Sequence, residues 1–103
     1  MSYGYVGSMR VKPGHRDAVL AILMRAAEGV RAFGCTTYIV SVSETDPDTI
    51  WTFEVWPSKA DHDASLQAPE TKAAVGEAMP MLTGEFTGQD LSVVGGSGLA
   101  AAG

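Results

Sequence analysis

The chain has 103 residues, of which 46% are hydrophobic and 18% charged, and its formal net charge is −5. This length suits a single domain, and the negative charge argues against binding to nucleic acid or to an anionic membrane surface. The only cysteine, Cys35, excludes an intrachain disulfide and a cysteine-rich zinc cluster. So small a charged fraction leaves a thin polar surface for a small monomer, which indicates self-association.

The start of the chain lacks the charged and apolar regions of a signal peptide. The longest uninterrupted apolar run, residues 18–24, is too short to span a bilayer. We therefore expect a soluble, cytoplasmic protein.

The first half of the chain begins with a strand and a helix. Residues 3–11 alternate loosely between large apolar and small or polar side chains, which predicts a strand. Residues 12–14, Lys-Pro-Gly, end it, and residues 15–32 then follow a helical period with one apolar stripe. Gly34 stands where a left-handed C-terminal cap is expected.

Two further strands form a predicted hairpin. Residues 35–44 and 49–56 are rich in Thr, Val, Ile and aromatic side chains, and the Thr-Asp-Pro-Asp segment 45–48 predicts the turn between them. By alternation, one face of the second strand carries Trp51, Phe53 and Val55, and the other carries Ile50, Thr52, Glu54 and Trp56. Because both faces carry large apolar groups, we expect both to be covered.

The second half begins with two short helices. Ser58 is a good N-cap for a helix that runs to about Leu66, and Pro69 begins a second helix that reaches Met79. Residues 86–94 then predict a fourth strand.

The order β-α-β-β-α-β predicts an α+β, ferredoxin-like split βαβ sandwich, with a four-stranded antiparallel sheet and helices on one face. We expect one domain over residues 1–94, followed by a flexible Gly- and Ala-rich tail at 95–103. The other face of the sheet would be apolar and bare, so a second copy of the chain is its expected cover and a homodimer the expected assembly.

His62 is the main candidate for chemistry, because it alone titrates near neutral pH outside the start of the first helix. Its helix should lie beside the Trp56 end of the third strand. It is either a solvated histidine between Asp61 and Asp63 or a base or hydrogen-bond donor in a pocket. His15, the other histidine, is expected to be exposed.

Glu54 is the second candidate, because a carboxylate inside Trp-Thr-Phe-Glu-Val-Trp is costly to bury unless it is paired. An ion pair with Arg10, or with another basic group near the subunit contact, would make it structural, and a place in a substrate pocket would make it functional. Several large side chains could line an apolar cavity between sheet and helices, or could simply form the core: Trp51, Trp56, Tyr38, Met79 and Met81.

Other kinds of site have little support. The chain has no P-loop and no dinucleotide-binding glycine pattern in a strand-to-helix turn, which argues against a nucleotide cofactor. Cys35 could in principle meet His62 as a nucleophile pair, but a cysteine at a strand start is more often a small packing residue.

Two segments resemble the antibiotic biosynthesis monooxygenase (ABM) superfamily over roughly residues 3–94. Residues 11–17, Val-Lys-Pro-Gly-His-Arg-Asp, resemble the junction of its first strand and helix. A strand ending in Glu-x-Trp, a helix bearing His and a Pro-x-x-Lys restart resemble its second signature, here at residues 51–59, 62–66 and 69–73.

The resemblance implies a dimeric α+β barrel, in which the sheets of two subunits pack together and each subunit keeps its own pocket. It also implies a quinol-type monooxygenase that needs no flavin, haem or metal, because a phenolic or hydroquinone substrate reduces O2 itself. Carried over residue by residue, His62 becomes the catalytic base or donor, Glu54 an orienting acid and Trp56 part of the pocket wall.

Two departures from the family pattern matter. In many relatives the helix histidine falls at the position of Ser65 here, one turn after His62 on roughly the same face, so Ser65 is also a pocket candidate. The haem-degrading branch uses an asparagine, and this chain has none, which argues against haem oxygenation. An isomerase or lyase acting on a small carbonyl compound, or a non-catalytic dimeric binding module, remains an alternative.

Overall fold

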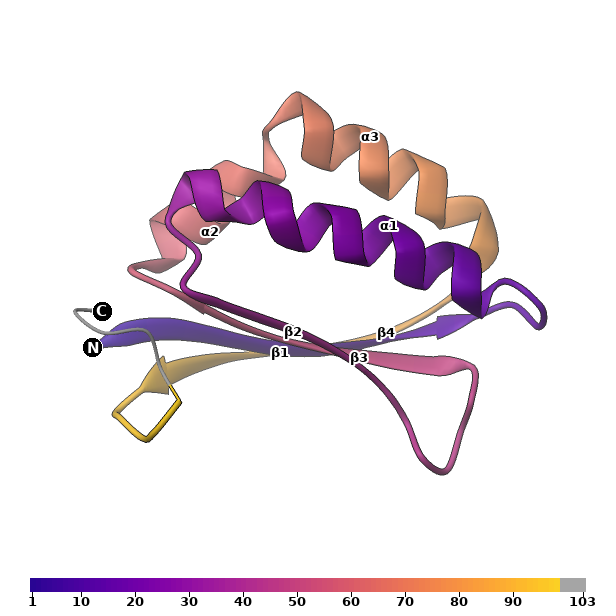
Figure 1. The fold of residues 1–103 in the computed structure, drawn as a ribbon, viewed down its shortest axis with the longest axis horizontal. Coiled ribbons are helices and arrows are strands. Elements are labelled where there is room, and N and C mark those ends of the chain that lie inside the picture. The colour runs from indigo at the N-terminus through magenta and orange to yellow at the C-terminus, as the bar shows by residue number, and fades with distance from the viewer. Residues whose placement is uncertain (99–103) are drawn as a thin grey trace.

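The computed structural model describes residues 1–98, and in it three helices cover one face of a four-stranded antiparallel sheet (Figure 1). This confirms the predicted α+β, ferredoxin-like architecture. In chain order, the elements are β1 (Ser2–Val11), α1 (Arg16–Gly29), the 3-10 turn η1 (Val30–Phe33), β2 (Thr37–Val42), β3 (Thr49–Trp56), α2 (Lys59–Leu66), α3 (Pro69–Ala78), the 3-10 turn η2 (Met79–Met81) and β4 (Leu82–Val93).

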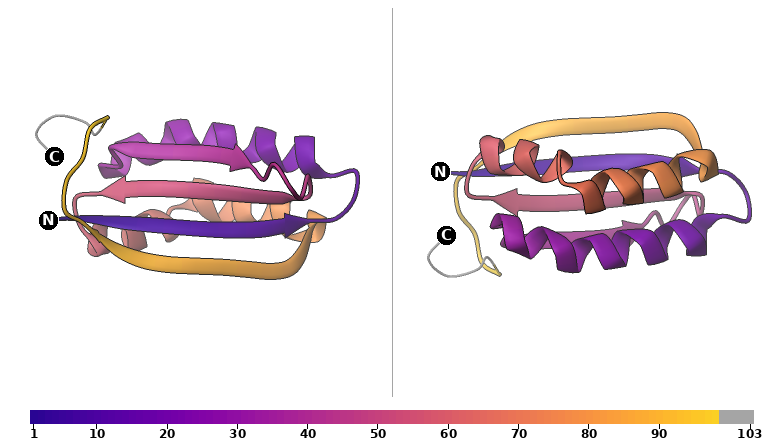
Figure 2. Two further views of the ribbon diagram at one scale, coloured as in Figure 1. Left: turned by 90° about the horizontal axis from the view of Figure 1, so that it is seen from below. Right: turned by 90° about the horizontal axis from the view of Figure 1, so that it is seen from above.

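The strand order is β2-β3-β1-β4, so β1 and β3 form the centre of the sheet. Seen from the helix side, α1 lies over the β2 half and α3 over the centre, and β4 runs along an uncovered edge (Figure 2). No helix within residues 1–98 is long and apolar enough to cross a membrane.

The first helix ends in a tighter turn than the sequence predicts. Its last residues form η1, and Gly34 follows with φ 95°, the left-handed cap that the sequence indicates. The Gly34 amide donates to the Arg31 carbonyl at 3.0 Å and the Cys35 amide to the Val30 carbonyl at 3.3 Å. These bonds satisfy carbonyls at the helix end and turn the chain back toward β2.

Helix α2 begins at the N-cap that the sequence predicts. The Ser58 hydroxyl oxygen accepts a hydrogen bond from the Asp61 amide at 3.2 Å. Pro69 occupies the first turn of α3, where its missing N–H leaves no unsatisfied donor. The cap fixes where α2 starts and thereby the direction in which His62 points.

Strand β4 starts at Leu82, four residues before the predicted start at Phe86. The pairing with β1 shifts register between Met9 and Val11, and Gly84 adopts φ 93°. A bulge breaks the period-two alternation on which the prediction relied, so the first residues of the strand show no strand pattern.

The hydrophobic core has two parts, one at each end of β1. Near Val11, the buried side chains come from the sheet, α1 and α3: Val11, Val19, Ile22, Ile50, Ala78 and Leu82. Near Tyr3, the buried side chains are Tyr3, Val30, Cys35 and Trp56. These two clusters hold the helix layer on the sheet.

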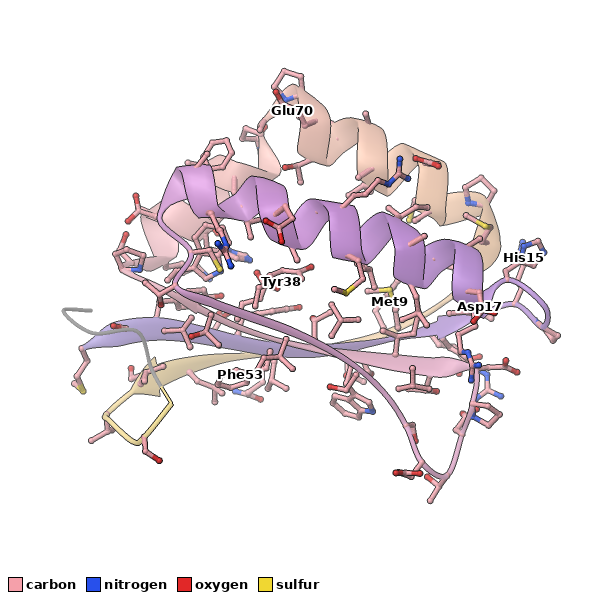
Figure 3. The ribbon with its side chains drawn as sticks, viewed as in Figure 1. Met9, His15, Asp17, Tyr38, Phe53 and Glu70 are labelled. Carbon is pink, nitrogen blue, oxygen red and sulfur yellow. The ribbon has the colours of Figure 1, made fainter. Side chains whose placement is uncertain are left out.

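The sheet face opposite the helices carries large apolar side chains that are uncovered in the single chain. Ile39, Trp51 and Leu91 are 51%, 41% and 38% exposed. Phe53 points to this side of the sheet, whereas Met9 and Tyr38 point toward the helices (Figure 3). We name Ile39, Trp51, Phe53 and Leu91 the open face.

Candidate functional site

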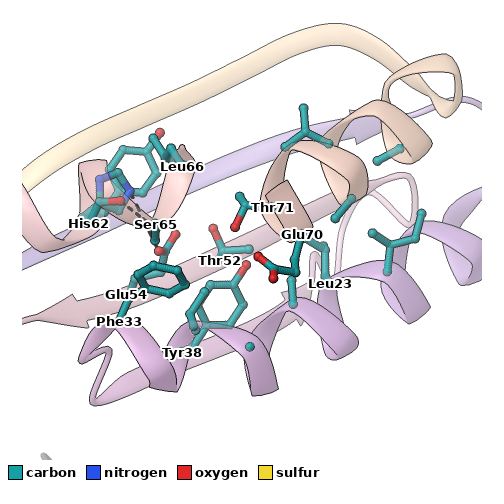
Figure 4. A pocket seen from close by; sticks show the side chains of 18 of the residues that line it. Leu23, Phe33, Tyr38, Thr52, Glu54, His62, Ser65, Leu66, Glu70 and Thr71 are labelled. Atoms are coloured by element: carbon teal, nitrogen blue, oxygen red, sulfur yellow. Dashed lines mark hydrogen bonds and ion pairs between the residues drawn. The ribbon is translucent and has the colours of Figure 1, made fainter. Parts of the chain in front are cut away.

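A cavity of about 1060 Å³ lies between the sheet and the helices (Figure 4). Its floor comes from all four strands, and its walls come from α1, α2 and α3. Most of the lining is aliphatic or aromatic, with a small number of polar groups, which is the usual character of a small-molecule site.

His62 enters this cavity from the first turn of α2. Its side chain is only 11% exposed. The imidazole packs against three aromatic rings, with centroid distances of 5.3 Å to Tyr3, 5.5 Å to Tyr5 and 5.5 Å to Trp56. The ring is therefore enclosed, unlike the solvated histidine of the alternative interpretation.

Two carboxylates flank the imidazole. Nδ1 lies 3.0 Å from Asp63 Oδ1, and Nε2 lies 4.0 Å from Glu54 Oε1. With the Nδ1 proton donated to Asp63, Nε2 becomes the acceptor on the Glu54 side. This arrangement lets the ring take up a proton at Nε2, because either carboxylate can stabilise the imidazolium.

Glu54 is 8% exposed, and its Oε1 accepts a hydrogen bond from Trp56 Nε1–H at 3.0 Å. Burial raises the pKa of Glu54, and the Trp56 hydrogen bond and nearby His62 partly oppose that rise. Of these alternatives, the ion pair with Arg10 is wrong, because Arg10 bonds Asp46 instead. The register places Arg10 opposite Thr49 and Glu54 opposite Tyr5, so the two residues are far apart along the strands.

The raised pKa of Glu54 has a testable effect on stability. Between the unfolded and folded pKa values the native state binds more protons, so ionising Glu54 lowers the free energy of unfolding as pH rises through that window. The Gln side chain of Glu54→Gln cannot ionise. Across the same pH range, we therefore expect the free energy of unfolding of this variant to rise relative to that of the wild type. Urea unfolding at a series of pH values measures this difference.

The matched control is Glu44→Gln, which removes an exposed carboxyl in the β2–β3 turn. Its free energy of unfolding should run parallel to that of the wild type. A Glu54→Gln curve that also runs parallel would show that burial does not penalise the Glu54 carboxylate.

A second polar cluster, Tyr3, Lys59 and Asp90, borders His62. The Tyr3 hydroxyl donates to Asp90 Oδ1 at 2.6 Å, and Lys59 Nζ lies 3.0 Å from Asp90 Oδ2. The hydrogen bonds from Tyr3 and Lys59 lower the pKa of Asp90, whereas burial and Asp90 raise the pKa of Tyr3. The cluster ties edge strand β4 to β1 and α2 beside the cavity.

Tyr5 lies over a pair of glycines. Gly7 and Gly88 face each other across β1 and β4. A Cβ at Gly88 would stand 2.2 Å from the Tyr5 hydroxyl oxygen, and one at Gly7 would stand 2.9 Å from its ring. The opposite side of the ring is available to His62, whose plane is inclined by 28° to it. The two glycines thus provide the space that allows this stacking.

Gly88→Ala should displace the Tyr5 ring and loosen its stacking on His62. We expect a loss of about 1–3 kcal/mol in the free energy of unfolding, typical of overpacking. Gly76→Ala is the control, because a Cβ at this position in α3 meets nothing within 4 Å. It should stabilise the protein by roughly 0.5–1 kcal/mol. Equal effects of the two variants in urea unfolding would contradict the packing of Tyr5 on Gly88.

Only some of the site residues predicted from the sequence line the cavity. Five of them line the cavity: His62, Glu54, Tyr38, Ser65 and Met79. Trp56 is 1% exposed and does not line the cavity. It contributes indirectly, because its Nε1–H donates a hydrogen bond to Glu54. Trp51 lies on the open face, and Met81 packs against the core cluster around Val11, so neither contributes to the cavity lining.

Ser65 and Cys35 have local structural partners. The Ser65 hydroxyl donates to the His62 carbonyl at 2.6 Å, within α2. Cys35 is buried, and its Sγ donates to the Thr37 carbonyl at 3.2 Å, which agrees with a packing role. The sequence reasoning missed Tyr3, Tyr5 and Asp90. Tyr3 and Tyr5 share one face of β1, and that alternation was the signal available.

Comparisons with known proteins identify the family of the chain. The family model described as "Antibiotic biosynthesis monooxygenase" matches residues 2–77. A protein of Chloroflexus aurantiacus J-10-fl, described as a "putative antibiotic biosynthesis monooxygenase", is 38% identical with a TM-score of 0.85, over 97% of this chain and 100% of that one. A search of curated proteins gave no match.

A similarly described protein of Caulobacter crescentus CB15 is 22% identical with a TM-score of 0.84, over 91% of each chain, and supports the fold alone. The family match covers most of the sequence, and the Chloroflexus protein matches it along nearly its whole length. The chain therefore belongs to the antibiotic biosynthesis monooxygenase family.

Proposed function

We propose that the protein is a cofactor-independent monooxygenase that oxidises a phenolic or hydroquinone-type aromatic substrate with O2. The observation that carries the proposal is the enclosed pair of His62 and Glu54 at one end of an apolar, aromatic-lined cavity. Membership of the ABM family supports the same reaction class.

In this reaction His62 Nε2 takes the proton of the substrate hydroxyl. Asp63 and Glu54 stabilise the resulting imidazolium, and the surrounding rings keep water away. The electron-rich substrate anion gives one electron to O2, and the substrate radical and superoxide combine to form a C–O bond. The peroxide takes back the proton from His62. Its O–O bond then breaks as water leaves with the hydrogen of the attacked ring carbon, which becomes a carbonyl. One O2 and one phenol thus give one quinone and one water, and a hydroquinone gives a hydroxyquinone and one water.

The test is oxygen consumption by the purified, chelator-treated protein with a panel of quinols, followed by mass spectrometry of products formed under ¹⁸O2. The proposal expects O2 uptake above the buffer rate and one labelled oxygen in the quinone. No stimulation by any quinol would contradict it. Turnover of a carbonyl compound without O2 would favour the isomerase or lyase. Binding of a quinol without any turnover would favour the non-catalytic binding module.

We further infer that two copies of the chain pair through the open face. Its large apolar side chains are too exposed for a small monomer, and a second copy would bury them in an isologous contact. Trp51→Lys places a charge in this contact and should convert the dimer to a monomer in sedimentation-equilibrium measurements. Gln67→Lys, exposed on the helix side, should leave the mass unchanged. A monomeric wild type would contradict the pairing.

A further inference from the structure

The charged groups that line the cavity are mostly acidic. The acids are Glu54, Glu70, Glu77 and Asp90, and the bases are Arg25, Lys59 and His62. Two of the bases are already paired. Arg25 Nη2 lies 3.3 Å from Glu77, and Lys59 Nζ lies 3.0 Å from Asp90.

The remaining lining charges are Glu54, Glu70 and His62. His62 already lies 4.0 Å from Glu54 and 3.0 Å from Asp63. If its imidazole becomes protonated, these two carboxylates balance the positive charge. Within residues 1–98, the cavity lining therefore offers no unpaired cation to a ligand. Figure 4 shows Glu54 and Glu70 among the lining side chains.

The lining imposes a cost on anionic ligands. A carboxylate or phosphate that leaves water for this cavity loses hydration, and a positive partner is what would best offset the loss. A hydroxyl or an amide loses far less and can donate to Glu54 or to Glu70. An unpaired charge on the wrong ligand is a general means of discrimination between compounds of equal shape.

We propose that the cavity selects aromatic phenols whose other substituents are uncharged and rejects those that carry a carboxylate or a phosphate. The proposal rests on the proposed function in taking a phenol as the ligand, but it concerns binding and needs no turnover. It narrows the substrate class to neutral phenols and hydroquinones.

The experiment compares two ligands of nearly equal shape, 6-hydroxy-2-naphthamide and 6-hydroxy-2-naphthoate, by isothermal titration calorimetry of the full chain at pH 7.5. We expect the amide to bind at least about 10-fold more tightly than the carboxylate, because only the carboxylate is buried without a partner. Equal affinities, or tighter binding of the carboxylate, would overturn the proposal.

A charge-reversal variant tests the cause of the selection. Glu70→Lys puts a cation in the cavity lining, so the carboxylate should gain affinity and the preference for the amide should shrink by about 5-fold. Glu44→Lys makes the same change of net charge in the exposed β2–β3 turn and should keep the wild-type preference. An equal response to both variants would overturn the local electrostatic cause.

Two outcomes separate this proposal from the proposed function. Selective binding of the amide together with no O2 uptake by any quinol would support the ligand class and contradict the oxidation. Absence of binding by both naphthalene ligands would overturn the selection, because the cavity would then not accept a neutral phenol of this size.

Discussion

Replacing His62 by alanine is expected to slow quinol-dependent oxygen consumption by about 100-fold, the usual contribution of a positioned acid–base group. The variant removes Nε2, the acceptor nearest Glu54 in the cavity, and leaves the fold largely in place because α2 keeps its Ser58 cap. Oxygen-electrode rates at saturating quinol, with circular dichroism as a check on folding, measure the loss.

His15→Ala is the matched control, because His15 is the other histidine and is exposed just before α1. Its rate should equal that of the wild type. His62→Gln should be nearly as slow as His62→Ala, since an amide can hydrogen-bond but cannot accept the proton. An unchanged rate in His62→Ala would show that His62 does not take part in the reaction.

Replacing Trp56 by alanine should have the largest effect on stability. Trp56 is 1% exposed and belongs to the core cluster with Tyr3, Val30 and Cys35. Truncating such a side chain leaves a cavity and costs about 3–5 kcal/mol in the free energy of unfolding. Urea unfolding at one fixed protein concentration measures it, so that any association contributes equally to all variants.

Trp56→Phe separates the volume of the side chain from its hydrogen bond. Phenylalanine fills much of the space but has no N–H for Glu54, so the buried carboxylate loses its donor. We expect a smaller loss of stability than in Trp56→Ala. Val94→Ala, at a position that is 88% exposed, should stay close to the wild type. A Trp56→Ala variant as stable as Val94→Ala would contradict the core position of Trp56.

The sequence predicts the local elements well because their signals are local. The alternation in residues 49–56 places Glu54 and Trp56 on the helix side of β3, and the structure confirms it. The same alternation already separates Trp51 from Trp56, because the two positions are five apart and side chains an odd number of positions apart point to opposite faces. Including Trp51 among the cavity residues conflicted with that pattern, and the structure places it on the open face.

The partners of buried groups could not be read from the sequence, because strand register is not a local property. The sequence offers Arg10 as one possible partner for Glu54, but the β1–β3 register puts Tyr5 opposite Glu54. The part played by Asp90 depends on the β1–β4 pairing, which sets Asp90 opposite Tyr5 and within 2.6 Å of the Tyr3 hydroxyl. The long β4 strand and its bulge carry no period that would reveal this pairing.

Helix periodicity explains why His62 and Ser65 both reach the cavity. The two positions are three residues apart and share one face of α2, and both line the cavity. His62 stands in the first turn, where Tyr3, Tyr5 and Trp56 enclose it.

The most direct measurement is a nuclear magnetic resonance titration that follows the imidazole signals of the two histidines while 6-hydroxy-2-naphthamide is added. His62 lies against the cavity, so its ring signals should shift in proportion to the bound fraction, while those of His15 stay in place. A ligand that binds by calorimetry but leaves the His62 signals unmoved would show that it binds elsewhere on the molecule, which would contradict the account.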